Sequence, residues 1–136
     1  MEAPRGSLHH VELQVLDDAI GGAAYDWLLA RLGYGPMERW ATGRSWQLGG
    51  TYIVLERAGR AMQHDRRGSG VNHLAFNAGA RSDVDRIWDE APAHGWTRLY
   101  VDRHPWAGGP GHYAAYLENA ERSKVELVAS EDADDG

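Results

Sequence analysis

Two histidines and one glutamate lie in short strand-like segments where their side chains could hold a divalent metal ion. These residues are His10, His73 and Glu126, found in LHHVELQV, VNHLAF and KVELV. Successive side chains of a strand point to opposite faces, so each of the three lies on the face opposite its apolar neighbours. The chain contains no cysteine, which leaves imidazole and carboxylate groups as metal ligands. We therefore expect these three side chains to be metal ligands.

The elements that would position these residues occur twice along the chain. Segment 8–15 aligns with segment 71–78 so that His10 falls on His73. A single inward histidine is more often structural, but two at equivalent places favour a metal site. Helical spacing follows each strand, over 20–28 and 84–91, and each helix is followed by a glycine and an aromatic residue. The expected helix caps are Asp17 or Asp18 in the first copy, and Ser82 with Asp85 in the second.

Three further strands are expected after each helix, over 36–40, 44–48 and 51–57 and over 97–101, 112–118 and 124–129. The sequence thus predicts an α+β fold of two βαβββ modules in tandem, as a curved mixed sheet around a metal-containing cavity. We expect one domain over residues 1–136. It comprises module one at about 8–57, a linker at about 58–70, module two at about 71–129 and an acidic tail at 130–136.

Charge and hydropathy exclude several classes of protein. With 14 basic and 20 acidic residues, a net charge of -6 argues against nucleic-acid binding. No apolar run approaches the roughly 20 residues that span a bilayer, and the N-terminus lacks the layout of a secretory signal. We therefore expect a cytoplasmic protein with no membrane or nucleic-acid partner.

The tandem modules with HHVELQV, NHLAF and KVELVA resemble the vicinal oxygen chelate superfamily of glyoxalases, bleomycin resistance proteins and dioxygenases. The stretch from Asp102 to Glu118 is similar to uncharacterised glyoxalase-like members. The resemblance covers roughly residues 8 to 129. It implies a glyoxalase-like fold and a divalent ion, Zn, Ni, Mn or Fe, bound by His10, His73 and Glu126. It also implies a small-molecule substrate and a homodimer.

The sequence departs from the superfamily pattern in two places. A fourth ligand, where it exists, would fall on Val54 or Glu56, and alternation alone does not choose between them. The turn before the last strand, Asn119 to Arg122, replaces the usual Asp-Pro-x-Gly, and Arg122 would reach either the site mouth or solvent.

Further polar side chains are candidates for acid–base or substrate-steering roles, in addition to a catalytic role for Glu126 itself. The acid–base candidates are Glu56, His104, Tyr113 and Tyr116, and the arginines that could steer an anionic substrate are Arg44 and Arg103. For each acid–base candidate a surface or packing role is at least as common, and for the two arginines a solvated position is the commoner outcome.

Three functions are compatible with these features. The leading one is a metal-dependent enzyme, of isomerase, lyase or transferase type, whose substrate chelates the ion through vicinal oxygens. A second is an Fe(II)-dependent dioxygenase, although ring-cleaving relatives generally have longer chains. A third is a non-enzymatic drug-binding protein, which would not need three converging ligands.

Overall fold

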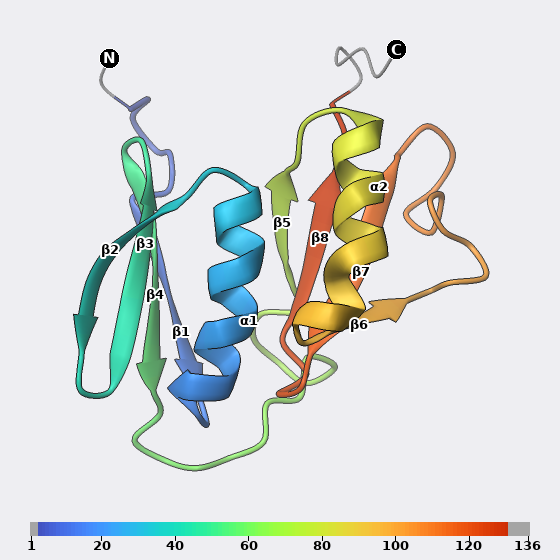
Figure 1. Cartoon of the computed structure of the whole chain (residues 1–136). Helices are drawn as coiled ribbons and strands as arrows, with labels where there is room; N and C mark the ends of the chain where they lie inside the picture. The colour runs from blue at the N-terminus through green and yellow to red at the C-terminus, as the bar shows by residue number, and fades with distance from the viewer. Residues whose placement is uncertain (1–2, 131–136) are drawn as a thin grey trace. The chain divides into compact units, whose positions relative to one another are not determined.

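The computed structural model describes residues 3–130, in which the chain forms two compact units that meet in sequence between Gln63 and His64. The first unit contains β1 (His10–Val15), α1 (Asp18–Arg31), β2 (Gly35–Trp40), β3 (Gly43–Leu48) and β4 (Thr51–Arg57). The second contains β5 (Leu74–Asn77), α2 (Arg81–Glu90), a 3-10 turn (Ala91–His94), β6 (Trp96–Leu99), β7 (Ala114–Asn119) and β8 (Lys124–Val128) (Figure 1). The expected α+β fold with two βαβββ modules is confirmed. The acidic tail lies almost wholly outside the described residues.

Both units build the same four-stranded sheet. The strand orders are β1-β4-β3-β2 and β5-β8-β7-β6, with the first pair parallel in each sheet and the others antiparallel. Glu12 lies two residues after His10 and is paired with Val54, whereas Ala75 lies two residues after His73 and is paired with Glu126. Val54 therefore occupies in the first sheet the place that Glu126 occupies in the second.

Each helix covers one face of its own sheet and leaves the other face free of helix (Figure 1). In β1 the apolar residues are more buried than His10, Glu12 and Gln14, so the predicted alternation is confirmed. Tyr25, Leu28 and Leu29 of α1 are buried, as are Val84 and Ile87 of α2. Burial of one large aliphatic side chain contributes about 1.5–3 kcal/mol, so these helix faces hold each module together.

The two helices begin differently from each other. The Asp17 carboxylate caps α1 and accepts from the backbone N–H of Ala19 at 2.8 Å, as one of the two alternatives predicted. The predicted cap at Ser82 with Asp85 is wrong. Helix α2 already begins at Arg81, because Asp83 accepts from the backbone N–H of Ala80 at 2.9 Å.

The expected strand at 112–118 begins two residues later than predicted. The backbone N–H of His112 donates to the carbonyl of Gly109 at 3.2 Å and so closes a turn, in which Gly109 and Gly111 have positive φ angles of 120° and 77°. Strand β7 therefore starts at Ala114 and leaves His112 in the preceding turn.

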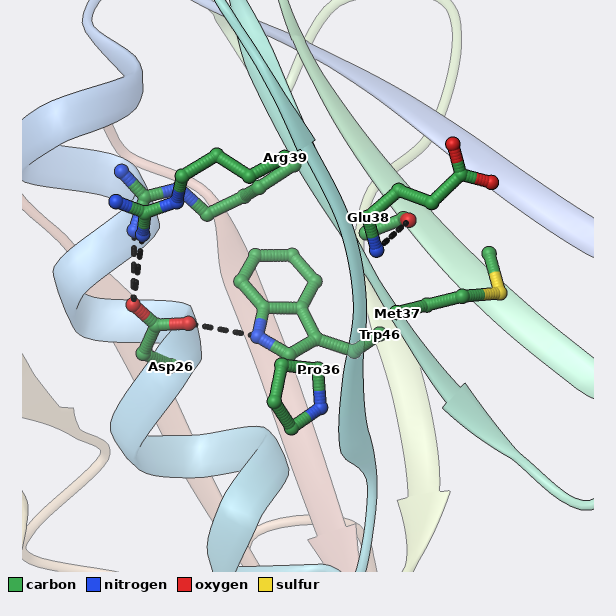
Figure 2. Close-up of a pocket in the computed structure, with 8 residues that line it drawn as sticks. Asp26, Pro36, Met37, Glu38, Arg39 and Trp46 are labelled. Atoms are coloured by element: carbon green, nitrogen blue, oxygen red, sulfur yellow. Dashed lines mark hydrogen bonds and ion pairs between the residues drawn. The ribbon is translucent and has the colours of Figure 1, made fainter.

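A clamp around Arg44 joins α1 to the sheet of the first unit. The guanidinium group of Arg44 lies 2.8 Å from Asp26 and 3.2 Å from Asp18, and Trp46 donates its indole N–H to Asp26 at 2.7 Å. Figure 2 shows Asp26 linked to Trp46 and to arginine above it, beside a hollow that is also lined by Pro36 and Met37. Arg44 pairs with two carboxylates of α1, so its charge holds the helix against the sheet and does not serve to steer a substrate.

Gly22 makes room for this clamp, which leads to a stability prediction. A Cβ atom at Gly22 would lie 2.5 Å from Cζ of Arg44, whereas one at the neighbouring Gly21 would make ordinary contacts at 3.8 Å. We expect Gly22→Ala to lower the free energy of unfolding by about 1–2 kcal/mol in urea denaturation. The matched control Gly21→Ala should raise it by about 0.5–1 kcal/mol, since alanine favours the helix. Equal effects of the two substitutions would contradict the clamp.

Candidate functional site

Glu126 is a buried carboxylate at the centre of β8, with only 6% of the residue exposed. His73 contacts its Oε1 through Nε2 at 3.0 Å, and His112 contacts Oε2 through its own Nε2. The hydroxyl of Tyr116 is a third hydrogen-bond donor to the same carboxylate. Burying a carboxylate is costly unless it is paired or hydrogen-bonded, and here three side chains meet that requirement.

The local fold explains how these side chains come together. Val125 and Leu127 are fully buried on the helix side of β8, which directs Glu126 to the opposite face. Tyr116 is the residue paired with Glu126 on the neighbouring strand β7. His73 immediately precedes β5 on the other side of β8, so the three strands place the group on one sheet face.

The electrostatics of the group separate the roles of its members. Burial alone would raise the pKa of Glu126, but the hydrogen bonds from His112, Tyr116 and His73 outweigh burial and hold the pKa below its ordinary value. Burial and the bond to Glu126 raise the pKa of Tyr116 to about 12. Tyr116 thus remains a hydrogen-bond donor at neutral pH, and Glu126 remains ionised.

Asn72 fixes the orientation of the His73 ring. The amide nitrogen of Asn72 donates to the carbonyl of Arg66 at 3.0 Å, so its oxygen faces Nδ1 of His73 at 2.7 Å. Nδ1 therefore donates to Asn72, and Nε2 faces Glu126: a ring with both protons donates from Nε2 to the carboxylate, whereas a ring with one proton leaves the Nε2 lone pair for a metal ion. A histidine that donates one ring N–H to a fixed acceptor and presents the other nitrogen has the arrangement of a metal ligand.

His10, the third predicted ligand, belongs to the first unit. Its ring stacks on Tyr52 at 4.6 Å between centroids, and its Nδ1 lies 2.9 Å from Nδ1 of His9. Within residues 3–130, no three His, Asp or Glu side chains are arranged to hold a metal ion. The chemistry of the donors nevertheless fits a divalent cation, because Glu126 and an oriented imidazole nitrogen lie side by side.

The other predicted acid–base residues lie elsewhere. Glu56 accepts from Thr42 and from the Trp40 indole, each at 2.6 Å, and these two bonds lower its pKa. The Tyr113 hydroxyl donates to Asp85 of α2. His104 stacks on Trp88 of α2 with 3.6 Å between ring centroids, and burial lowers its pKa. Tyr113 and His104 are thus engaged by the helix that covers the opposite face from Glu126.

Arg103, a candidate for substrate steering, and Arg122, expected at the site mouth or in solvent, both have partners. Arg103 lies over the ring of Tyr100 at 5.2 Å, and Arg122 contacts Glu118 at 3.2 Å. The turn that holds Arg122 is built on the side chain of Asn119, which accepts from two backbone N–H groups at 3.0 Å.

His112 and Asn72 are the members of this group that the sequence did not reveal. His112 was expected as the first residue of the strand over 112–118, but nothing in that pattern connected its side chain with Glu126. One signal was present in the glycine-rich segment before it. A Cβ atom at Gly108 would lie 2.5 Å from the His112 ring and 2.6 Å from the Tyr116 hydroxyl, so only glycine fits there without displacement.

Comparison with known proteins agrees with this fold. YqjT, an uncharacterised protein of Bacillus subtilis strain 168, is 41% identical over 125 residues, which cover 90% of this chain and 98% of YqjT. A crystal structure from Bacillus halodurans, provisionally classed as a glyoxalase, is 42% identical with a TM-score of 0.88 and covers 93% of this chain and 97% of that one. Lactoylglutathione lyase from Agrobacterium tumefaciens shares the fold alone, with 18% identity, a TM-score of 0.63 and coverage of 94% and 96%. No family model matches the chain.

The fold and these likenesses define the class of the protein. The chain belongs to the glyoxalase/bleomycin resistance protein/dioxygenase family, which is the vicinal oxygen chelate superfamily. The resemblance inferred from the sequence motifs is confirmed.

The hydrogen bond from Tyr116 leads to a prediction on pH dependence. The folded pKa of Glu126 is lowered, so the ionised carboxylate stabilises the fold at neutral pH, and this stabilisation is lost as pH falls through the lowered pKa. Tyr116→Phe removes one donor, so the pKa of Glu126 should rise and the free energy of unfolding at pH 7 should fall by about 1–2 kcal/mol. Carboxyl-carbon NMR titration of metal-free protein measures the first effect.

The control for this prediction is Tyr113→Phe, which removes a hydroxyl bonded to Asp85 instead. It should leave the pKa of Glu126 unchanged. A pKa of Glu126 that does not move in Tyr116→Phe, or moves equally in both variants, would contradict the assignment of Tyr116.

Proposed function

We propose that this protein is a small metal-dependent enzyme whose substrate chelates a divalent ion through two adjacent oxygens. The proposed ligands are His10, His73 and Glu126. The observation that supports the proposal most strongly is the buried Glu126 carboxylate beside an imidazole nitrogen that Asn72 orients toward it. The same bond to Asn72 would direct the Nε2 lone pair of His73 toward a metal ion held beside Glu126.

The ion would be Zn, Ni, Mn or Fe, and three protein ligands leave about three positions of an octahedral ion for substrate and water. When bound, such an ion supplies a Lewis acid that polarises the two substrate oxygens. Glu126 is suited to this role because its lowered pKa keeps it ionised at neutral pH.

Two neighbouring side chains are suited to act on the substrate itself. Tyr116, with a pKa of about 12, would donate a hydrogen bond and help to orient the Glu126 carboxylate. His112 has 40% of its side chain exposed and contacts the same carboxylate, so its ring lies within reach of both solvent and the site. We therefore propose His112 as the group that moves a proton in an isomerase or lyase type of reaction.

The protein is further proposed to act as a cytoplasmic homodimer. Within residues 3–130, no helix is long and apolar enough to cross a membrane. The exposed edge strand β2, in which all six residues are exposed, supports a partner because such edges are usually covered. Light scattering in solution would test the oligomeric state.

Removal of proposed ligands should remove the metal. We expect His10→Ala and Glu126→Ala each to lower the metal content at least tenfold. The reason is that removal of one of three protein ligands greatly weakens the affinity of the site for the ion. Elemental mass spectrometry of protein purified without affinity metal or chelator, with circular dichroism as a check of folding, measures this.

The matched control is His94→Ala, which removes an imidazole from the end of the 3-10 turn and should leave the metal in place. Stoichiometric metal in both ligand variants would contradict the assignment. Bound iron in the wild-type protein would favour a dioxygenase. Failure to take up any supplied ion would favour a drug-binding protein.

A further inference from the structure

Lys124 is the only lysine of the chain, since every other basic residue among the 14 is an arginine. It begins β8, two residues before Glu126, so both side chains emerge on the same sheet face. Only 9% of Lys124 is exposed. Lysine is among the residues least often buried without a partner of opposite charge, so its surroundings need an explanation.

The ammonium group of Lys124 is held by aromatic side chains. Its Nζ donates to the hydroxyl of Tyr100 at 2.8 Å and lies 4.9 Å from the centre of the Tyr100 ring and 5.3 Å from that of Tyr116. Glu118, its partner across the strands, pairs instead with Arg66 and Arg122 at 3.2 Å each. Among residues 3–130, no carboxylate forms an ion pair with Lys124.

Positive charge therefore exceeds negative charge on this part of the sheet. Besides Lys124, three arginines contact Glu118 or Tyr100, namely Arg66, Arg103 and Arg122. The carboxylates on the same part of the sheet are Glu118, within these contacts, and Glu126, two residues along β8, so four cations face two carboxylates. The Nε of Arg66 is buried and has no hydrogen-bond partner in the described part of the chain. In a protein of net charge -6, this excess points to an anionic ligand.

The repeat gives a second line of support. In the first sheet, Tyr52 is paired with His10, and its place corresponds to that of Lys124 beside His73 in the second. The second module thus carries a cation where the first carries a neutral ring. Tyr100, which receives the Lys124 hydrogen bond, has a φ angle of 54°, a conformation that costs a residue other than glycine about 1–3 kcal/mol. Such strain is typical of residues held in place for a ligand.

We propose that Lys124 and Tyr100 form a subsite for a carboxylate of the substrate, next to the site at Glu126. One N–H of the ammonium group donates to Tyr100, and the other N–H groups can donate to a ligand. The Tyr100 hydroxyl accepts from Lys124, so its O–H can also donate to a ligand. These two donors match the two oxygens of a carboxylate. Because the proposal rests on the proposed function, it makes the substrate a small acid whose chelating oxygens lie roughly 6–7 Å from this carboxylate, the spacing of residues i and i+2 in a strand.

Two probes that differ in one carboxylate test this subsite. Both 2-oxoglutarate and 2-oxovalerate have five carbons and the same vicinal oxygens, but only the first carries a distal carboxylate. By calorimetry with metal-loaded protein, we expect 2-oxoglutarate to bind at least tenfold more tightly than 2-oxovalerate, since a charge-assisted hydrogen bond contributes about that factor. Lys124→Gln should abolish this preference and leave the affinity for 2-oxovalerate unchanged.

Control variants separate the subsite from charge in general and from folding. Arg39→Gln removes an exposed cation from the first unit and should keep the full preference. Tyr100→Phe keeps the ring but removes the hydroxyl, and should reduce the preference several-fold. Equal binding of the two probes by the wild-type protein, or a preference that survives in Lys124→Gln, would overturn the proposal.

A further measurement keeps this test independent of the metal. Because lysine occurs once, lysine-labelled protein gives a single set of side-chain NMR signals. In metal-free protein, acetate should shift the Lys124 Cε signal saturably, and more weakly in Tyr100→Phe. If the protein takes up no metal, the proposed function fails while this titration still decides the subsite. Absence of a saturable shift would then overturn the subsite as well.

Discussion

The buried Glu126 carboxylate is the constraint around which the second module is organised. A carboxylate in the centre of a strand needs compensating donors, and these come from the residue before β5, the turn before β7 and the strand β7 itself. Each donor in turn has its own support: Asn72 orients His73, and Gly108 leaves room for His112 and Tyr116. The glycine-rich turn before β7 and the start of β5 therefore both serve to hold donors around Glu126.

The two modules share an architecture but differ in chemistry. Where the second sheet places Glu126, the first places Val54, and where the second places Lys124, the first places Tyr52. The first module carries His10 on the polar face of β1, and its Arg44 fixes α1 to the sheet through Asp18 and Asp26. The two copies of the fold thus carry different polar residues at equivalent places.

The fold could be predicted closely from the sequence, because strand alternation, helical spacing and the internal repeat are local signals. The same alternation directed Glu126 to the polar face, as the structure has it. The roles of His112 and Asn72 could not be predicted, since they depend on side-chain orientations that a strand pattern does not specify. The cap expected at Ser82 failed for a related reason, because two acidic residues lie near the start of α2, and Asp83 accepts from Ala80 while Asp85 accepts from Tyr113. Lys124 was overlooked because a lysine at the start of a strand ordinarily lies in solvent.

The central claim is that Glu126 and two imidazoles bind a divalent ion. X-ray absorption spectroscopy of the protein loaded with one equivalent of zinc tests this most directly, since its fine structure counts the imidazole rings around the ion. The account predicts a shell of nitrogen and oxygen ligands with the scattering of two imidazoles. A shell of oxygen ligands without imidazole scattering would contradict it, because the ion would then be bound away from His10 and His73.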